Sequence, residues 1–95
     1  MDIEKYIDEI EEELDGAHGY AKKAKEAKKY SPQHATMYNE MAVQELGHAE
    51  KLLQMLKDDA SKWSEPHKTA AEMLIPWVEK RVAHHTHEIK EHLKA

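Results

Sequence analysis

The chain has no cysteine, three glycines and three prolines in 95 residues. The absence of cysteine excludes disulfide bonds and thiolate metal ligands. So little glycine and proline argues against a sheet protein with many tight turns. The 35% of charged residues and the long Ala/Glu/Lys/Leu stretches are typical of a helical protein. At this length we expect one domain, residues 1–95, that buries roughly 60 to 65% of its unfolded surface.

Net positive charge and long apolar runs are also missing. The formal charge of −5 argues against nucleic-acid binding, and the lysines of residues 22–29 are interpreted as a solvated helix end. No apolar run approaches the roughly 20 residues of a membrane span. The acidic, periodic N-terminus, MDIEKYIDEIEEEL, does not suit a secretory signal or a transit peptide. We therefore expect no nucleic-acid or membrane partner and a cytoplasmic protein.

Turn signals separate two long helical segments in the first part of the chain. Residues 3–29 and 31–60 both carry apolar residues at helical spacing. Between them, Ser31 has the character of an N-cap and Pro32 that of a first helical residue. A turn this short places helices antiparallel, so the sequence predicts a helical hairpin over residues 3–60.

A third segment follows the hairpin. The stretch Ser64-Glu65-Pro66 is a second capping signal, and it predicts further helix over residues 64–94. Pro76 interrupts this segment, removes one helical hydrogen bond and disfavours helix at the preceding residue. We therefore expect either a kink or a pair of helices, and an all-α fold in which a Pro-kinked third segment accompanies the hairpin.

A carboxylate lies in the middle of the apolar arc of residues 31–60. At about 100° per residue, Glu45 falls at the centre of this arc and not on the polar face. The apolar members of the arc are Met37, Tyr38, Met41, Ala42, Ala49, Leu52, Leu53 and Leu56. An unpartnered buried carboxylate would cost several kcal/mol. His48 follows one turn later, so both side chains can reach one point, and Glu-x-x-His is a spacing that metal ligands use.

Glu13 occupies a comparable place in the first segment. It lies about 40° from the centre of that segment's apolar arc, between Ile10 and Ala17. Counted from the turn, Glu13 lies roughly 25 Å and Glu45 roughly 21 Å along their helices, so we expect both acids in one layer. Two buried carboxylates would repel each other, whereas a divalent cation cancels their charge. Oxygen and imidazole ligands suit iron, manganese or zinc, so we predict Glu13, Glu45 and His48 as metal ligands.

Three ligands per chain are half of the set that a dinuclear carboxylate site uses. In a four-helix bundle such a site takes a glutamate from each of two helices and Glu-x-x-His from each of the other two. Two copies related by a two-fold axis would supply this set, because their interface presents the same face twice. We therefore predict that two hairpins form a four-helix bundle, as a homodimer or higher homo-oligomer, with two metal ions shared between subunits. The third segment would brace this assembly.

At these residues the chain resembles the ferritin-like superfamily. The pair Glu13-Leu14 followed by Ala17 and Tyr20 is similar to the first metal-ligand helix of ferritins, and Glu45-Leu46-Gly47-His48 is similar to the Glu-x-x-His of the second. The two-helix layout is most similar to the encapsulated ferritins, whose subunits carry half a site and complete it by dimerising. The likeness covers roughly residues 3–60.

The resemblance implies that the protein binds Fe(II) and oxidises it with dioxygen. It implies Glu13 and Glu45 as carboxylate ligands and His48 as the nitrogen ligand, and all three as the catalytic residues. The chain departs from the superfamily pattern because no second Glu-x-x-His follows and because Gly16 and Gly47 stand beside the site.

Three residues near the predicted ligands have two interpretations each. Tyr20 and Tyr38 lie two turns from Glu13 and Glu45, and they either hydrogen-bond a ligand carboxylate or pack as amphipathic core residues. His18 lies at the edge of the apolar stripe, where a surface residue is more common than a ligand.

A competing group of possible ligands lies in the third segment. It consists of His84-His85-Thr86-His87 with Glu88 and His92. Glu88 stands four residues from a histidine on either side, a spacing that can chelate a divalent ion, although the charged neighbours favour a solvated face. His85 borders the apolar row and is the member expected to approach the core.

Two other classes of function remain open at this point. One is a non-enzymatic assembly or adaptor module in which a buried Glu/His network, with or without a structural divalent ion, fixes helix register. The other is a metal-buffering protein without redox turnover, in which the histidine group takes part.

Overall fold

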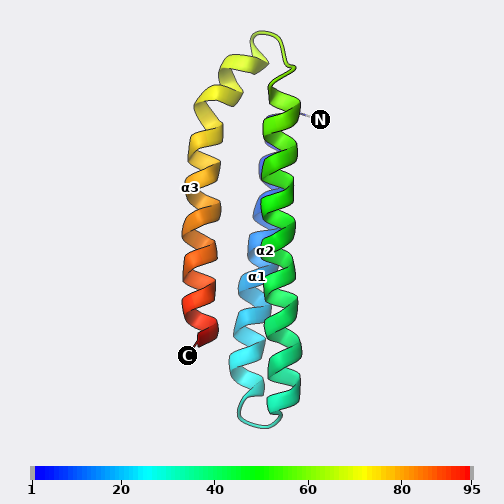
Figure 1. Ribbon diagram of the computed structural model, residues 1–95, viewed down its shortest axis with the longest axis vertical. Helices are drawn as coiled ribbons and strands as arrows, with labels where there is room; N and C mark the ends of the chain where they lie inside the picture. The colour runs from blue at the N-terminus through cyan, green and yellow to red at the C-terminus, as the bar shows by residue number, and fades with distance from the viewer. Residues whose placement is uncertain (1, 95) are drawn as a thin grey trace.

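Residues 2–94, the part of the chain that the computed structural model describes, form three helices and no strand (Figure 1). They are α1 (Ile3–Ala27), α2 (Pro32–Ala60) and α3 (His67–Lys94). α1 and α2 lie side by side and antiparallel, and α3 runs back along them, so the molecule is a rod of 54 × 19 × 15 Å. The predicted all-α fold with its antiparallel hairpin is confirmed, and dimerisation remains a prediction.

Side-chain caps mark the start of both hairpin helices, and the turn lies where the predicted Ser31-Pro32 signal places it. The Asp2 side chain accepts a hydrogen bond from the backbone N–H of Lys5, at 3.0 Å. The Ser31 hydroxyl oxygen accepts one from the backbone N–H of His34, at 3.2 Å, and Pro32 opens α2 as predicted. Side chains that accept from these N–H groups replace the partners that a helix start lacks.

The third segment is one helix, so of the two predicted alternatives, a kink or a pair of helices, the structure excludes the pair. α3 runs unbroken from His67 to Lys94 with Pro76 inside it. Figure 1 shows that its first turns stand at an angle to the rest, as the alternative prediction of a kink requires. A proline removes one intrahelical hydrogen bond and bends the axis, while contacts with the other helices hold both halves.

Small residues allow α1 and α2 to approach closely along the core. Ala17, Ala42 and Ala49 are fully buried there. The central core combines residues of all three helices: Ile10, Leu14, Ala17, Ala21, Ala42, Leu46, Ala49, Val78, Val82 and Ile89. Because this core takes the alanine-rich side of α2, the wider apolar arc of that helix is not covered in full.

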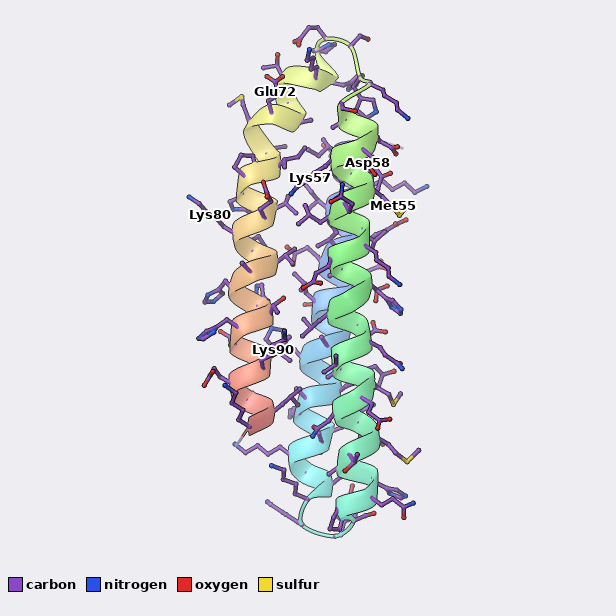
Figure 2. All side chains as sticks on the ribbon, viewed as in Figure 1. Met55, Lys57, Asp58, Glu72, Lys80 and Lys90 are labelled. Carbon is purple, nitrogen blue, oxygen red and sulfur yellow. The ribbon has the colours of Figure 1, made fainter. Side chains whose placement is uncertain are left out.

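Met37 and Met41 of the predicted apolar arc are exposed, so their prediction as core residues is wrong for the isolated chain. Met55 of the same helix is exposed as well. We call Met37, Met41 and Met55 the methionine stripe. Their side chains are 55%, 36% and 50% exposed. On a helical wheel they lie within about 40° of one another, beside the buried arc of Ala42 and Leu56. Figure 2 shows Met55 and further sulfur atoms along the edge of α2 that faces away from α3. The apolar arc of α2 therefore has a covered half and an open half.

Ion pairs join α3 to the hairpin. The Arg81 guanidinium donates two hydrogen bonds to the Glu11 carboxylate, one of them 2.9 Å long from Nη2 to Oε2. Lys57 Nζ of α2, which is labelled in Figure 2, lies 2.8 Å from Glu79 Oε2 of α3. Glu11 lies outside the apolar arc of residues 3–29, which by itself indicates a solvated charge. This interpretation is wrong, because Arg81 of a neighbouring helix pairs with Glu11.

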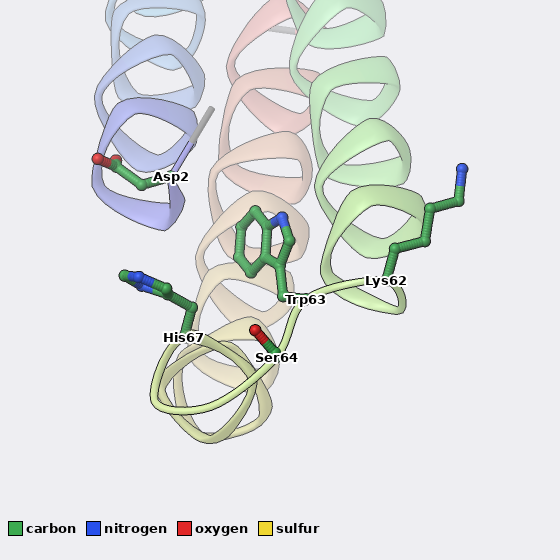
Figure 3. Close-up of a pocket in the computed structure, with 5 residues that line it drawn as sticks. All are labelled: Asp2, Lys62, Trp63, Ser64 and His67. Carbon is green, nitrogen blue, oxygen red and sulfur yellow. The ribbon is translucent and has the colours of Figure 1, made fainter.

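The end of the rod near the α2–α3 turn is closed by an aromatic side chain. A pocket there is lined by Asp2, Lys62, Trp63, Ser64 and His67 (Figure 3). The Trp63 ring points from the turn back towards the helices, and Lys62 points away. Trp63 packs on the smaller core of Ile3, Tyr6, Leu56, Ala60 and Ala71. This pocket lies about 16 Å along α1 from the layer of Glu13.

Replacement of Tyr6 by phenylalanine is expected to lower the free energy of unfolding by about 1.5 to 3 kcal/mol, the range for a hydrogen bond to a charged group. Tyr6 is 2% exposed and donates its hydroxyl hydrogen to the Asp59 carboxylate. This bond, with burial and the Asp59 charge, raises the pKa of Tyr6 to about 12. Its contribution to stability is therefore present below pH 10 and lost as the pH rises through 12.

Urea unfolding at pH 7 measures this effect. Tyr30→Phe is the matched control. It deletes the same chemical group, a tyrosine hydroxyl, from a side chain that is 73% exposed. Equal decreases in the free energy of unfolding of the two variants would contradict a stabilising role for the Tyr6–Asp59 contact.

Candidate metal centre

The structure brings Glu13, Glu45 and His48 together. Each offers one ligand atom, and these three atoms lie within 4.8 Å of one another. His48 Nδ1 is 3.3 Å from Glu13 Oε2 and 3.6 Å from Glu45 Oε1. The acids of α1 and α2 thus share a layer, as the residue count from the turn predicts. We call these three residues the Glu/His cluster.

The Glu/His cluster lies at the rim of the α1–α2 contact and not inside the core. The Glu13 and Glu45 side chains are 28% and 25% exposed, and that of His48 is 54% exposed. The prediction that Glu45 points into the apolar interior of the chain is therefore wrong in part, because α2 turns its alanine side to the core. The cluster is packed by protein on one side and open to solvent on the other.

The open side of the cluster borders the methionine stripe. A surface pocket here is lined by Glu9, Glu12, Glu13, His48, Lys51, Leu52 and Met55. The residues Met41, His48 and Met55 fall within about 40° on the helical wheel of α2, so the ligands and the exposed sulfur atoms share one face. Whatever covers this face would also close the cluster.

A glycine makes room for the carboxylate of Glu45. A Cβ atom built on Gly16 would lie 2.8 Å from Glu45 Oε2, closer than non-bonded atoms come. Within residues 2–94, a Cβ on Gly19 or Gly47 would meet nothing inside 4 Å. Because Gly16 has no Cβ atom, the Glu45 side chain can lie against α1 beside Glu13.

The two carboxylates interact strongly. A hydrogen bond with the Glu13 carboxyl group raises the pKa of Glu45, burial and the Glu13 charge add to the rise, and His48 opposes it. Two acids this close share a proton more readily than they both ionise. A divalent cation between them would replace that proton and remove the repulsion.

The donor set fits an iron-type ion. Two carboxylates and one imidazole are hard and intermediate ligands, which suit iron, manganese and zinc. The space beside Gly16 leaves the Glu45 carboxylate free to face the other two ligands. The assignment of these residues as metal ligands remains a prediction that this geometry supports.

The two tyrosines near the site contact each other. The rings of Tyr20 and Tyr38 stack, with centroids 6.3 Å apart and planes at 23°, and Lys23 Nζ lies within 6 Å of both centroids. In the described part of the chain, neither hydroxyl hydrogen-bonds Glu13 or Glu45. Amphipathic packing, the second of the two interpretations, is the one observed.

A second cluster of possible ligands joins α1 to α3. His18, His85 and Glu88 also place one ligand atom each within 4.8 Å of the others, and His18 Nε2 lies 2.9 Å from His85 Nδ1. We call these three residues the His/Glu cluster. The spacing of residues 84–92 indicates His85 and Glu88 as possible ligands, whereas the sequence favours a surface position for His18. Its position at the edge of the α1 stripe was the available signal, and which helix meets that edge depends on how α3 packs.

No helix in residues 2–94 has the length and apolar character needed to cross a membrane.

Comparison with known proteins assigns the family. The rubrerythrin family model matches residues 8–93, a range that includes both clusters. Searches of curated proteins and of solved structures give no match. The predicted resemblance to the ferritin-like superfamily is confirmed, and the encapsulated-ferritin subfamily remains a prediction. The chain belongs to the rubrerythrin family of ferritin-like proteins, which typically bind iron.

Proposed function

We propose that this protein oxidises Fe(II) with dioxygen at a di-iron carboxylate site shared between two copies of the chain. The observation that carries the proposal is the Glu/His cluster itself. It has three ligands of the types that iron takes, held in one layer by two helices and open on the side where the apolar surface of α2 is also uncovered.

Charge balance supports two ions per pair of chains. Each chain contributes the two carboxylates of Glu13 and Glu45, so a pair contributes four negative charges. Two divalent ions carry four positive charges, and the neutral imidazole of His48 from each chain adds nitrogen ligands. Metal-bound carboxylates favour the more highly charged ferric product, because the attraction grows with the charge of the ion.

The reaction balances with iron as the substrate. Two Fe(II) ions would each give one electron to dioxygen, which takes up two protons and leaves as hydrogen peroxide. The part of the chain in this step would be to hold the ions close together with Glu13 and Glu45. His48 would offer Nδ1, which lies 3.3 and 3.6 Å from the two carboxylates, as the nitrogen ligand.

A second copy of the chain is the proposed cover of the open face. Such a pair would bury the methionine stripe and complete the ligand set in one step, because a two-fold interface places the same residues opposite one another. Methionine suits this role because its unbranched side chain adapts to the facing surface. The resulting four-helix bundle is the half-site layout of encapsulated ferritins.

Two measurements on purified protein test the proposal together. Near-ultraviolet absorbance after aerobic addition of Fe(II) should rise faster than in buffer, and sedimentation should give twice the chain mass or a multiple of it. The double variant Met41→Gln/Met55→Gln should shift the mass towards the monomer and slow iron oxidation at least tenfold. The exposed Met73 of α3 supplies the control, because Met73→Gln should change neither result.

Each possible outcome bears on one part of the proposal. Oxidation no faster than in buffer would contradict the oxidase function, and a stable dimer without turnover would favour the assembly module instead. An obligate monomer that oxidises iron at full rate would contradict the shared site.

A further inference from the structure

The His/Glu cluster lies on the other flank of α1 from the Glu/His cluster. Glu13 and His18 are five residues apart, so their side chains leave the helix about 140° apart. His18 faces α3, where it meets His85 and Glu88, whereas Glu13 faces α2. The two clusters therefore share a helix and no residue.

The separations between the ligand atoms are close to those that a tetrahedral ion requires. Two ligand atoms about 2.0 to 2.1 Å from a tetrahedral zinc ion are about 3.3 Å apart. His18 Nε2 lies 2.9 Å from His85 Nδ1 and 3.6 Å from Glu88 Oε1. These two separations differ from the required value by a few tenths of an ångström, and the third, between His85 and Glu88, lies within 4.8 Å, so rotation of the Glu88 side chain would have to bring its carboxylate closer to His85.

A further histidine orients the carboxylate. His84 Nε2 lies 3.4 Å from Glu88 Oε2, while Glu88 Oε1 faces His18. A carboxylate held through one oxygen presents the other to a metal ion in a fixed direction, as partners of metal ligands commonly do. His92 lines the same surface pocket as His18 and Glu88, so the site is accessible from solvent.

We propose that His18, His85 and Glu88 form a second metal site, which takes a zinc-class divalent transition-metal ion and ties α3 to α1. Two imidazoles and one carboxylate are the ligand set of many zinc sites, with one position left for water. Calcium and magnesium are excluded as preferred occupants, because both favour all-oxygen ligands. The proposal does not depend on iron oxidation at the Glu/His cluster.

The site would add a metal-mediated link to the last part of α3, which otherwise packs on the hairpin through apolar side chains such as Ile89. The Arg81–Glu11 and Lys57–Glu79 contacts hold the middle of this helix, and the α2–α3 turn holds its start. Beyond Arg81 the helix continues to Lys94, and the described contacts with the hairpin there are apolar ones, of Val82 and Ile89, and those of the His/Glu cluster. An ion bound through His85 and Glu88 would attach this last part to His18, 67 residues away from His85 in the chain.

Zinc binding to the His48→Ala variant tests the proposal, because this variant lacks a ligand of the Glu/His cluster. Equilibrium dialysis with Zn²⁺ should give one bound ion per chain, and thermal unfolding followed by circular dichroism should show a midpoint raised by several degrees. Adding His18→Ala should weaken zinc binding at least tenfold and remove the rise. Adding His87→Ala, an exposed histidine of the same helix, should change neither.

The remaining variants distinguish the proposed site from simpler ones. Glu88→Gln tests the third ligand at an exposed position, where loss of folding is not expected, and it should also weaken zinc binding at least tenfold. Undiminished binding after His18→Ala would confine the ion to the His84/Glu88 pair of α3 and overturn the proposal. Failure of His48→Ala to bind zinc at all, while it remains helical, would overturn it too.

Discussion

Replacement of Glu45 by glutamine is expected to slow Fe(II) oxidation more than about 100-fold and to leave the iron-free protein slightly more stable than the wild type. Changes to the partners of metal ligands commonly cost 10- to 100-fold in metal affinity or activity, so loss of a ligand should cost more. The amide keeps the shape of the side chain but lacks the charge. In the absence of metal the same change removes a repulsive neighbour of Glu13.

The direction of the pH effect follows from the Glu13 contact. Because the folded-state pKa of Glu45 is raised, its contribution to stability is fully present below the ordinary pKa of 4.5 and is lost as the pH rises through the folded value. The stability advantage of the variant should therefore be present at pH 7 and vanish below about pH 4. Metal-dependent stabilisation of the wild type should change in the opposite direction, since binding requires the ionised acids.

Iron oxidation and thermal unfolding with and without Fe(II) measure these effects. Glu50→Gln is the matched control, because Glu50 is an exposed acid of the same helix outside the cluster. A Glu45→Gln protein that oxidises iron at the wild-type rate would remove Glu45 from the ligand set. A large loss of stability in the metal-free variant would show that Glu45 has a structural role instead.

Replacement of Gly16 by alanine is expected to separate stability from activity. Alanine favours a helix interior by about 1 kcal/mol over glycine, so the melting temperature should rise by several degrees. The new Cβ would lie 2.8 Å from Glu45 Oε2, and the carboxylate must turn away from His48 to avoid it. Because a displaced ligand weakens the site, iron oxidation should fall at least tenfold.

Gly19→Ala supplies the control for this pair of effects. Gly19 is exposed on the same helix, and a Cβ there would meet no atom of residues 2–94 within 4 Å. Its helix should gain stability by a similar amount while iron oxidation stays unchanged. If Gly16→Ala keeps full activity, the Glu45 carboxylate does not need its present position for the reaction.

The sequence predicts the fold to within a few residues because each signal is local. Ser31 caps α2 and Pro32 begins it through contacts within one turn, so no knowledge of the neighbouring helices is needed. The shared layer of Glu13 and Glu45 was also predictable, because the turn between their helices is short and the helical rise is constant.

Other features depend on packing between distant segments and could not be predicted in this way. The apolar arc of α2 is wide enough for two neighbours, and the sequence does not indicate which half α1 and α3 cover. Met37 and Met41 were therefore assigned to the core, although the chain leaves them exposed. The partners of Glu11 and His18 could not be predicted for the same reason. These partners, Arg81 and His85, belong to α3 and lie about 70 residues away in the chain.

The short turn at residues 28–31 has a consequence for the order of assembly during synthesis. All three residues of the Glu/His cluster lie before it or within the helix that follows, so the hairpin can close and gather them while α3 is still in the ribosome. Pairing of nearby segments requires little loop entropy and is fast. The His/Glu cluster must wait until α3 has emerged. The three iron ligands that one hairpin contributes to the shared site are thus expected to come together before the three proposed zinc ligands do.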